Sequence, residues 1–207
     1  MKCNEKGRSM IEMLGVLAIV GVLSVGGIAG YSKAMVKVKN NRLITETSEL
    51  VMNIRTMYAG QHSFSNISES LLIKAGAVPH NMINEDSTLS HAFGGKVKVF
   101  TSHIEGGYPR AFEVYLTDLD TLTCIAMVTM NWGQDTSSGF QGLYVGASEE
   151  EISEPQMLNI YTPHVSQPDA GIYTPGLHEH NVPLTVYDAS TACACSSVKC
   201  SIGLKYI

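Results

Sequence analysis

One acidic residue, Glu12, lies at the start of a stretch that is otherwise apolar enough to enter a membrane. From Met13 to Ser32 the chain carries no charged side chain, and about 20 apolar residues are enough to cross a bilayer as a helix. A carboxylate left unpaired in lipid is costly. The position of Glu12 therefore makes it a candidate functional residue.

The cysteines form a second group with chemical potential. Cys3 precedes the apolar run, whereas Cys124, Cys193, Cys195 and Cys200 follow it. Four cysteines in one compartment suit two disulfides in an oxidising space. The competing interpretation is a metal site, but the C-x-C-x4-C spacing of the last three lacks the paired C-x2-C of common zinc sites. Cys193 and Cys195 are too close to bridge easily, so two pairings remain open: 124–193 with 195–200, or 124–195 with 193–200.

Histidines suggest a possible metal site in the segment LHEHN, which contains His178, Glu179 and His180, with His164 nearby in the chain. A His-x-His pair on a strand faces one side and can bind a metal. Spacing fixes no third ligand, and the surrounding sequence is typical of an exposed loop. We therefore expect exposed polar residues here, with no metal and no cofactor. The sequence also lacks a nucleophile elbow, a phosphate loop and an H-E-x-x-H motif.

Composition separates an apolar N-terminal part from a polar remainder. The 207 residues give room for one globular domain and an appendage. The formal net charge of -5 argues against a nucleic-acid binder that works through a general basic field. Together these features predict an anchor followed by a soluble head.

The residues after Gly7 predict one long helix, from about residue 8 to 59. Beyond the apolar run come basic residues at 33, 37, 39 and 42, and then a buried helical face. Arg42 and Glu46 lie one turn apart and can pair, and Gly60 is a reasonable stop. The buried face is formed by residues at three- and four-residue spacing: Leu43, Thr47, Leu50, Val51, Ile54, Met57 and Tyr58.

The head is predicted to be α+β. Asn66 and Glu69 resemble a capping box that opens a short helix, and residues 131–190 are expected to form a long surface excursion because they are rich in Gly, Pro, Ser and Asp. The other expected elements are a helix over 68–76, strands over 96–100 and 112–116, a helix over 118–130, and a last strand over 201–207.

The segment GRSMIEMLGVLAIVGVLS resembles the N-terminus of type IV pilins and of the related pseudopilins of type II secretion. In that family a short basic leader ends in Gly and is removed by a dedicated membrane peptidase on the cytoplasmic side. The new N-terminus is methylated, and a Glu near it is followed by an unbroken apolar helix. Here Gly7 matches the leader Gly, Arg8 the new N-terminus and Glu12 the acidic residue. Family members usually carry Phe, Met or Leu where this chain has Arg8.

The resemblance implies a fold and a division of the chain. The implied fold is a long N-terminal helix packed on a small antiparallel sheet, with a disulfide-bounded C-terminal loop, as in pilins with a large, class-b-like head. The implied parts are a leader over 1–7, a helix over 8–60 with a membrane and filament-core half (8–32) and an amphipathic half (33–60), and an extracytoplasmic head over 61–207.

The resemblance also implies a structural function and no catalysis. The subunit would be cut after Gly7, methylated at Arg8, held in the bacterial inner membrane and then driven by an assembly machinery into an extracellular helical pilus. In the filament core, the amine of one subunit would neutralise Glu12 of a neighbour. The implied partners are other copies of the chain, the prepilin peptidase, the assembly machinery and the membrane, with no nucleic acid as primary partner.

Four alternatives remain open at this stage, and one of them is a plain single-pass anchor, which explains neither Gly7 nor Glu12. A secretory signal peptide would use the small residues Gly27 and Ala29 for cleavage. A pseudopilin shares the same N-terminus, but major pseudopilins carry a calcium loop around an Asp-Pro-Trp-Gly-like motif, whereas the lone Trp132 here lies in MNWGQD. A membrane-anchored extracytoplasmic enzyme or metal binder would use the histidines at 178 and 180 and would leave Gly7 and Glu12 without a role.

Overall fold

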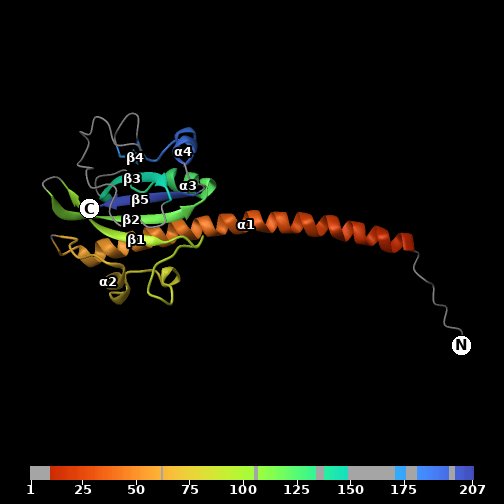
Figure 1. Ribbon diagram of the computed structural model, residues 1–207, viewed down its shortest axis with the longest axis horizontal. Coiled ribbons are helices and arrows are strands. Elements are labelled where there is room, and N and C mark those ends of the chain that lie inside the picture. Colours follow the sequence, from red (N-terminus) through yellow and green to blue (C-terminus); the bar gives the residue numbers. More distant parts are fainter. Residues whose placement is uncertain are drawn as a thin grey trace. The chain divides into compact units, whose positions relative to one another are not determined.

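The computed structural model divides the chain into two compact units, Met1–Lys39 and Asn40–Ile207. Helix α1, Met10–Tyr58, passes through both (Figure 1), which confirms the predicted long helix. The structure describes residues 10–61, 63–104, 107–133, 138–148, 171–175, 181–195 and 199–207.

In the first unit, the described residues are all helical and all exposed. Within the described chain, α1 is the one helix that is long and apolar enough to cross a membrane, and its apolar window is 0% buried. Side chains such as Val22 and Leu23 are 74% and 69% exposed. A contiguous apolar surface of this size is unstable in water and must be covered by lipid or by protein.

In the second unit, α1 contributes one face to the hydrophobic core. Leu43, Leu50 and Ile54 are fully buried, as the three- and four-residue spacing predicts. Near the end of the helix, the ring of Tyr58 packs against Phe64 at a centroid distance of 5.0 Å. The predicted pair within the helix is also present, since Arg42 Nε donates to Glu46 Oε1 at 2.8 Å.

Five antiparallel strands form one sheet in the order β1-β2-β5-β3-β4. β5 lies at its centre, paired with β2 on one side and β3 on the other. Figure 1 shows the head half of α1 running along the sheet, and side chains of α1, β2 and β5 join in one core. The strands are β1 Val97–Ile104, β2 Tyr108–Leu119, β3 Phe140–Ala147, β4 Ile172–Tyr173 and β5 Cys200–Tyr206.

A buried ion pair lies on the two central strands. Glu113 of β2 is in register with Lys205 of β5, their Nζ and Oε1 atoms are 3.9 Å apart, and neither side chain is exposed. The Ser102 hydroxyl donates to Glu113 at 2.5 Å, Tyr115 donates to the other carboxylate oxygen, and Lys205 Nζ donates to the His103 carbonyl at 2.8 Å. Burial lowers the pKa of Lys205 to about 8, although the Glu113 carboxylate opposes this shift. These hydrogen bonds and the ion pair offset the free-energy cost of burying the two charges.

Short helices are closed by side-chain caps, and one cap differs from the prediction. α2 begins after Ser68, whose side chain accepts from the Leu71 N–H, so the predicted capping role of Asn66 is wrong. Asn66 instead has φ 61°, a left-handed conformation that Asn tolerates in turns. In α3, the Asp120 side chain accepts from the Thr123 N–H at 2.7 Å. The short helices are α2 Glu69–Lys74, η1 His80–Met82, α3 Thr121–Val128 and α4 Val186–Ala192.

The interpretation of residues 131–190 as a surface excursion is wrong in its described parts. This region supplies β3 to the sheet and contains both β4 and α4. In β3, Gly142 lies between the buried residues Phe140 and Leu143, and Gly146 follows the buried Val145. Glycine is depleted in strands, and here it obscures the alternation of apolar and polar residues that would indicate one. The strand is stabilised by its backbone hydrogen bonds to β5. The acidic segment 149–155 lies outside the described residues.

His91 makes the stability of the head depend on pH. It is 4% exposed, and its Nε2 donates to the Thr117 carbonyl at 2.7 Å while Nδ1 accepts from the Phe93 N–H at 3.2 Å. Burial lowers the pKa of His91 below 6.5, opposed by the Thr117 carbonyl, Asp118 and Glu46. Protonation of Nδ1 would break the hydrogen bond that Nδ1 accepts from the Phe93 N–H, and it would place a positive charge in the buried site.

We therefore expect the melting temperature of the full chain in detergent to fall as pH drops from about 7 to 5.5. The folded state favours the neutral ring of His91, so the pKa of His91 is lower in the folded chain than in the unfolded chain. The contribution of His91 to the free energy of unfolding is therefore fully present above its unfolded pKa and is lost as the pH falls through its folded pKa. The variant His91→Gln should lack this component of the decline. An identical pH profile for both chains would contradict the assignment.

Candidate assembly surfaces

The four cysteines after the anchor form two disulfides. Cys124 bonds to Cys193 with a Cα–Cα distance of 5.9 Å, and Cys195 bonds to Cys200 with a distance of 5.7 Å. This is the first of the two pairings that the sequence left open. The cysteines at 193, 195 and 200 are therefore occupied by disulfides in the structure, not arranged as metal ligands.

The longer disulfide joins two helices. Cys124 lies in α3, and Cys193 is the C-cap of α4, a helix that the sequence did not predict. The Leu184 N–H also donates to the Val128 carbonyl at 3.1 Å, so the start of α4 is held against the end of α3. The disulfides therefore connect α3 to the last strand in two steps, from α3 to α4 and from Cys195 to β5.

Glu12 lies in the first turn of α1 and is exposed. An acidic residue in this turn interacts favourably with the positive end of the helix dipole. Met10 and Ile11 beside it are 87% and 77% exposed. The predicted cleavage residues Gly7 and Arg8 lie outside the described residues, as do His164, His178 and His180.

The glycines of the apolar helix pack against no other element in the part of the chain that the structure describes. A Cβ built on any of them would meet no heavy atom within 4 Å of its position. Glycine costs about 1 kcal/mol relative to Ala in a helix interior, and small residues in apolar helices permit close approach of other helices. Close approach of a helix from another chain would explain them. The glycines concerned are Gly15, Gly21, Gly26, Gly27 and Gly30.

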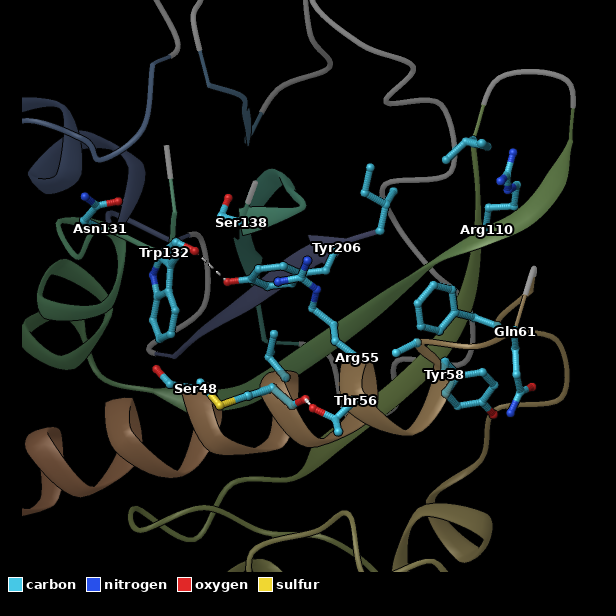
Figure 2. Close-up of a pocket in the computed structure, with 16 residues that line it drawn as sticks. Ser48, Arg55, Thr56, Tyr58, Gln61, Arg110, Asn131, Trp132, Ser138 and Tyr206 are labelled. Carbon is cyan, nitrogen blue, oxygen red and sulfur yellow. Dashed lines mark hydrogen bonds between the residues drawn. The ribbon is translucent and has the colours of Figure 1, made fainter. Parts of the chain in front are cut away.

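A groove of about 890 Å³ runs beside the end of α1, from Ser48 to Gln61 (Figure 2). Its far wall contains Trp132 and Tyr206, which are fixed by hydrogen bonds: Trp132 Nε1 donates to the Met127 carbonyl at 2.8 Å, and the Tyr206 hydroxyl donates to the Trp132 carbonyl at 3.0 Å. Sequence reasoning missed this groove because its walls come from segments far apart in the chain.

The family described as PilS N terminal matches this chain over residues 37–201. The match takes in most of the head and the amphipathic part of α1. The chain belongs to the PilS family.

Two curated relatives of this PilS-family chain are both named "Major structural subunit of bundle-forming pilus". The protein from Escherichia coli O111:H- is 30% identical over 155 residues, which are 73% of this chain and 77% of the relative. The protein from Escherichia coli O127:H6 (strain E2348/69 / EPEC) is 30% identical over 135 residues, which are 64% of this chain and 68% of the relative.

Solved structures show the same fold. The type IV b pilin from Salmonella typhi superposes with a TM-score of 0.51 at 18% identity and covers 79% of this chain and 97% of its own. TcpA, a type IV pilin from Vibrio cholerae El Tor biotype, superposes with a TM-score of 0.53 at 13% identity and covers 82% of this chain and 99% of its own. The predicted α+β pilin fold is confirmed.

Family and fold together identify the PilS-family chain as a type IV pilin. Its role is structural and not enzymatic, so the interpretation as an anchored enzyme is wrong. A pilin subunit self-assembles into a pilus, and its apolar N-terminal helix is consistent with a membrane anchor before assembly.

Proposed function

We propose that this chain is the structural subunit of an extracellular type IV pilus and is assembled through its N-terminal helix. A prepilin peptidase cuts after Gly7, and the new N-terminus at Arg8 is methylated. Residues 8–32 hold the subunit in the bacterial inner membrane until a pilus assembly machinery transfers it to the growing filament. The exposed apolar part of α1, with Glu12 in its first turn, is the observation that carries this proposal.

Glu12 sets the stagger between subunits in the proposed filament. Cleavage frees an amine at Arg8, and a neighbour's Glu12 neutralises that amine when the apolar helices stack. Pairing removes most of the cost of burying either charge, whereas a wrong stagger leaves both charges unpaired. The glycines of the same helix permit the close helix contacts that such a core requires.

The intact mass and N-terminal sequence of the protein from its native host test the proposed processing. We expect a chain that begins at Arg8, with the mass of one additional methyl group. Processing leaves the anchor in place, so this chain should be recovered from membranes and from sheared filaments. A chain that begins at Gly30, as a signal peptidase would leave it, contradicts the proposal, and so does a chain that retains residues 1–7.

A further inference from the structure

A rigid acidic loop projects from the head. Residues 84–88 have the sequence NEDST, and every one of them is exposed. Asp86 Oδ1 accepts from both the backbone N–H and the hydroxyl of Thr88, at 3.0 and 2.6 Å. Asn84 Nδ2 donates to the Thr88 hydroxyl at 2.9 Å, and the Ser90 hydroxyl donates to Asn84 Oδ1 at 2.8 Å. Glu85 and Asp86 are therefore presented on a fixed turn, which we call the acidic loop.

The groove beside α1 offers a positive charge at Arg110. Arg55, which has interactions within its own chain, also lines the groove, and the described lining contains no Asp or Glu side chain. Arg110 is exposed at the start of β2. Figure 2 shows Arg110 at the opposite end of the groove from Trp132. The lining also includes apolar side chains such as Met52 and Phe64.

The acidic loop and the groove lie at opposite ends of β1. The loop is tied to the start of the strand, because its flanking residue Leu89 accepts from the Val97 N–H at 2.9 Å. The groove includes Ile104, the last residue of the strand. Seven steps of about 3.3 Å separate these ends by roughly 23 Å. Because the loop is held by its own hydrogen bonds, it cannot fill the groove of its own chain.

We propose that the acidic loop of one subunit seats in the basic groove of the next subunit along the filament. The two surfaces are different and complementary, so the contact is heterologous. A heterologous contact that does not close into a ring generates an open helical stack. The proposal rests on the proposed function and adds to it a contact between the globular heads of successive subunits that fixes the rotation between them.

The chemistry of the groove suits this occupant. Arg is enriched in protein interfaces, as are aromatic residues and Met, and its guanidinium binds carboxylates through two parallel hydrogen bonds. Like charges brought together in an interface cost several kcal/mol. Reversal of the charge on one side of the contact should therefore reduce filament assembly, and reversal of the charges on both sides should restore it.

Charge reversal in the full chain tests the contact. We expect Arg110→Glu to reduce the yield of sheared filaments about tenfold, and the double variant Glu85→Lys with Asp86→Asn to do the same, because each places like charges together. Asn at position 86 keeps the side-chain oxygen that accepts from Thr88. The chain that combines all three substitutions should recover to within about threefold of the wild-type yield.

The control is Lys74→Glu, which reverses an exposed charge on α2 outside both surfaces and should leave the yield unchanged. Subunit levels in the membrane and melting temperatures in detergent show that each variant folds. Normal filaments from Arg110→Glu overturn the proposal, as does a combined chain that yields no more filaments than its parent variants. Failure of the proposed function appears separately, as a wild-type chain that forms no filaments, and this also overturns the contact.

Discussion

Replacement of Glu12 by Ala is expected to abolish filaments while the head still folds. An uncompensated charge buried by removal of its partner typically costs about 3–5 kcal/mol, a factor of about 150 to 5,000 in each association step. In the proposed filament core, the unpaired group would be the amine at Arg8 of the neighbouring subunit. The head lies in a separate unit, Asn40–Ile207, so its melting temperature and its disulfides should not change. Electron microscopy and the amount of sheared protein measure the loss.

Two further substitutions at the same position separate charge from size. Glu12→Asp retains the carboxylate and should retain a substantial part of the filaments, whereas Glu12→Gln keeps the volume without the charge and should behave like the Ala variant. If Glu12→Gln assembles as well as the wild type, the pairing role is wrong and the residue is only a polar group at the membrane surface.

Removal of the longer disulfide should destabilise the head more than removal of the shorter one. The chain-entropy relation gives roughly 4 kcal/mol for the Cys124–Cys193 link, with its sequence separation of 69, and about 2 kcal/mol for Cys195–Cys200, with a separation of 5. The longer link also holds α4 against α3. Double substitutions to Ala avoid the burial of new hydroxyl groups, since Cys124 and Cys193 are fully buried.

Urea unfolding of the full chain in detergent measures this difference. We expect Cys124→Ala with Cys193→Ala to lose more unfolding free energy than Cys195→Ala with Cys200→Ala, and to yield fewer filaments because less folded subunit is available. An equal or reversed order would mean that strain or packing at the shorter link outweighs loop entropy.

Local patterns identified the parts of the fold that are determined by local physics. The periodicity of α1 is visible because Leu43, Leu50 and Ile54 each bury one face of a helix against the same core. The motif around Glu12 was visible for a related reason, since a charge inside an apolar run stands out from its neighbours. The helix expected within residues 118–130 is also present, as α3, which Asp120 caps through contacts within one turn.

Features determined by distant contacts were not visible in the sequence. β3 escaped detection because its stability comes from pairing with a strand more than fifty residues later in the chain. A lysine is usually exposed, yet Lys205 is fully buried because β5 is a central strand and Glu113 lies beside it. The groove has the same origin: Arg55 and Arg110 belong to different elements, and no local pattern connects them.

The central position of β5 determines the order in which the head can be completed. β2 and β3 do not pair with each other; each pairs with Cys200–Tyr206. While the chain is being synthesised, both strands therefore expose unpaired backbone edges until residue 206 has emerged, and exposed edges invite pairing with other chains. Contacts between residues so far apart in sequence also form slowly. A chain that ends before β5 therefore lacks the strand that joins the two parts of the sheet.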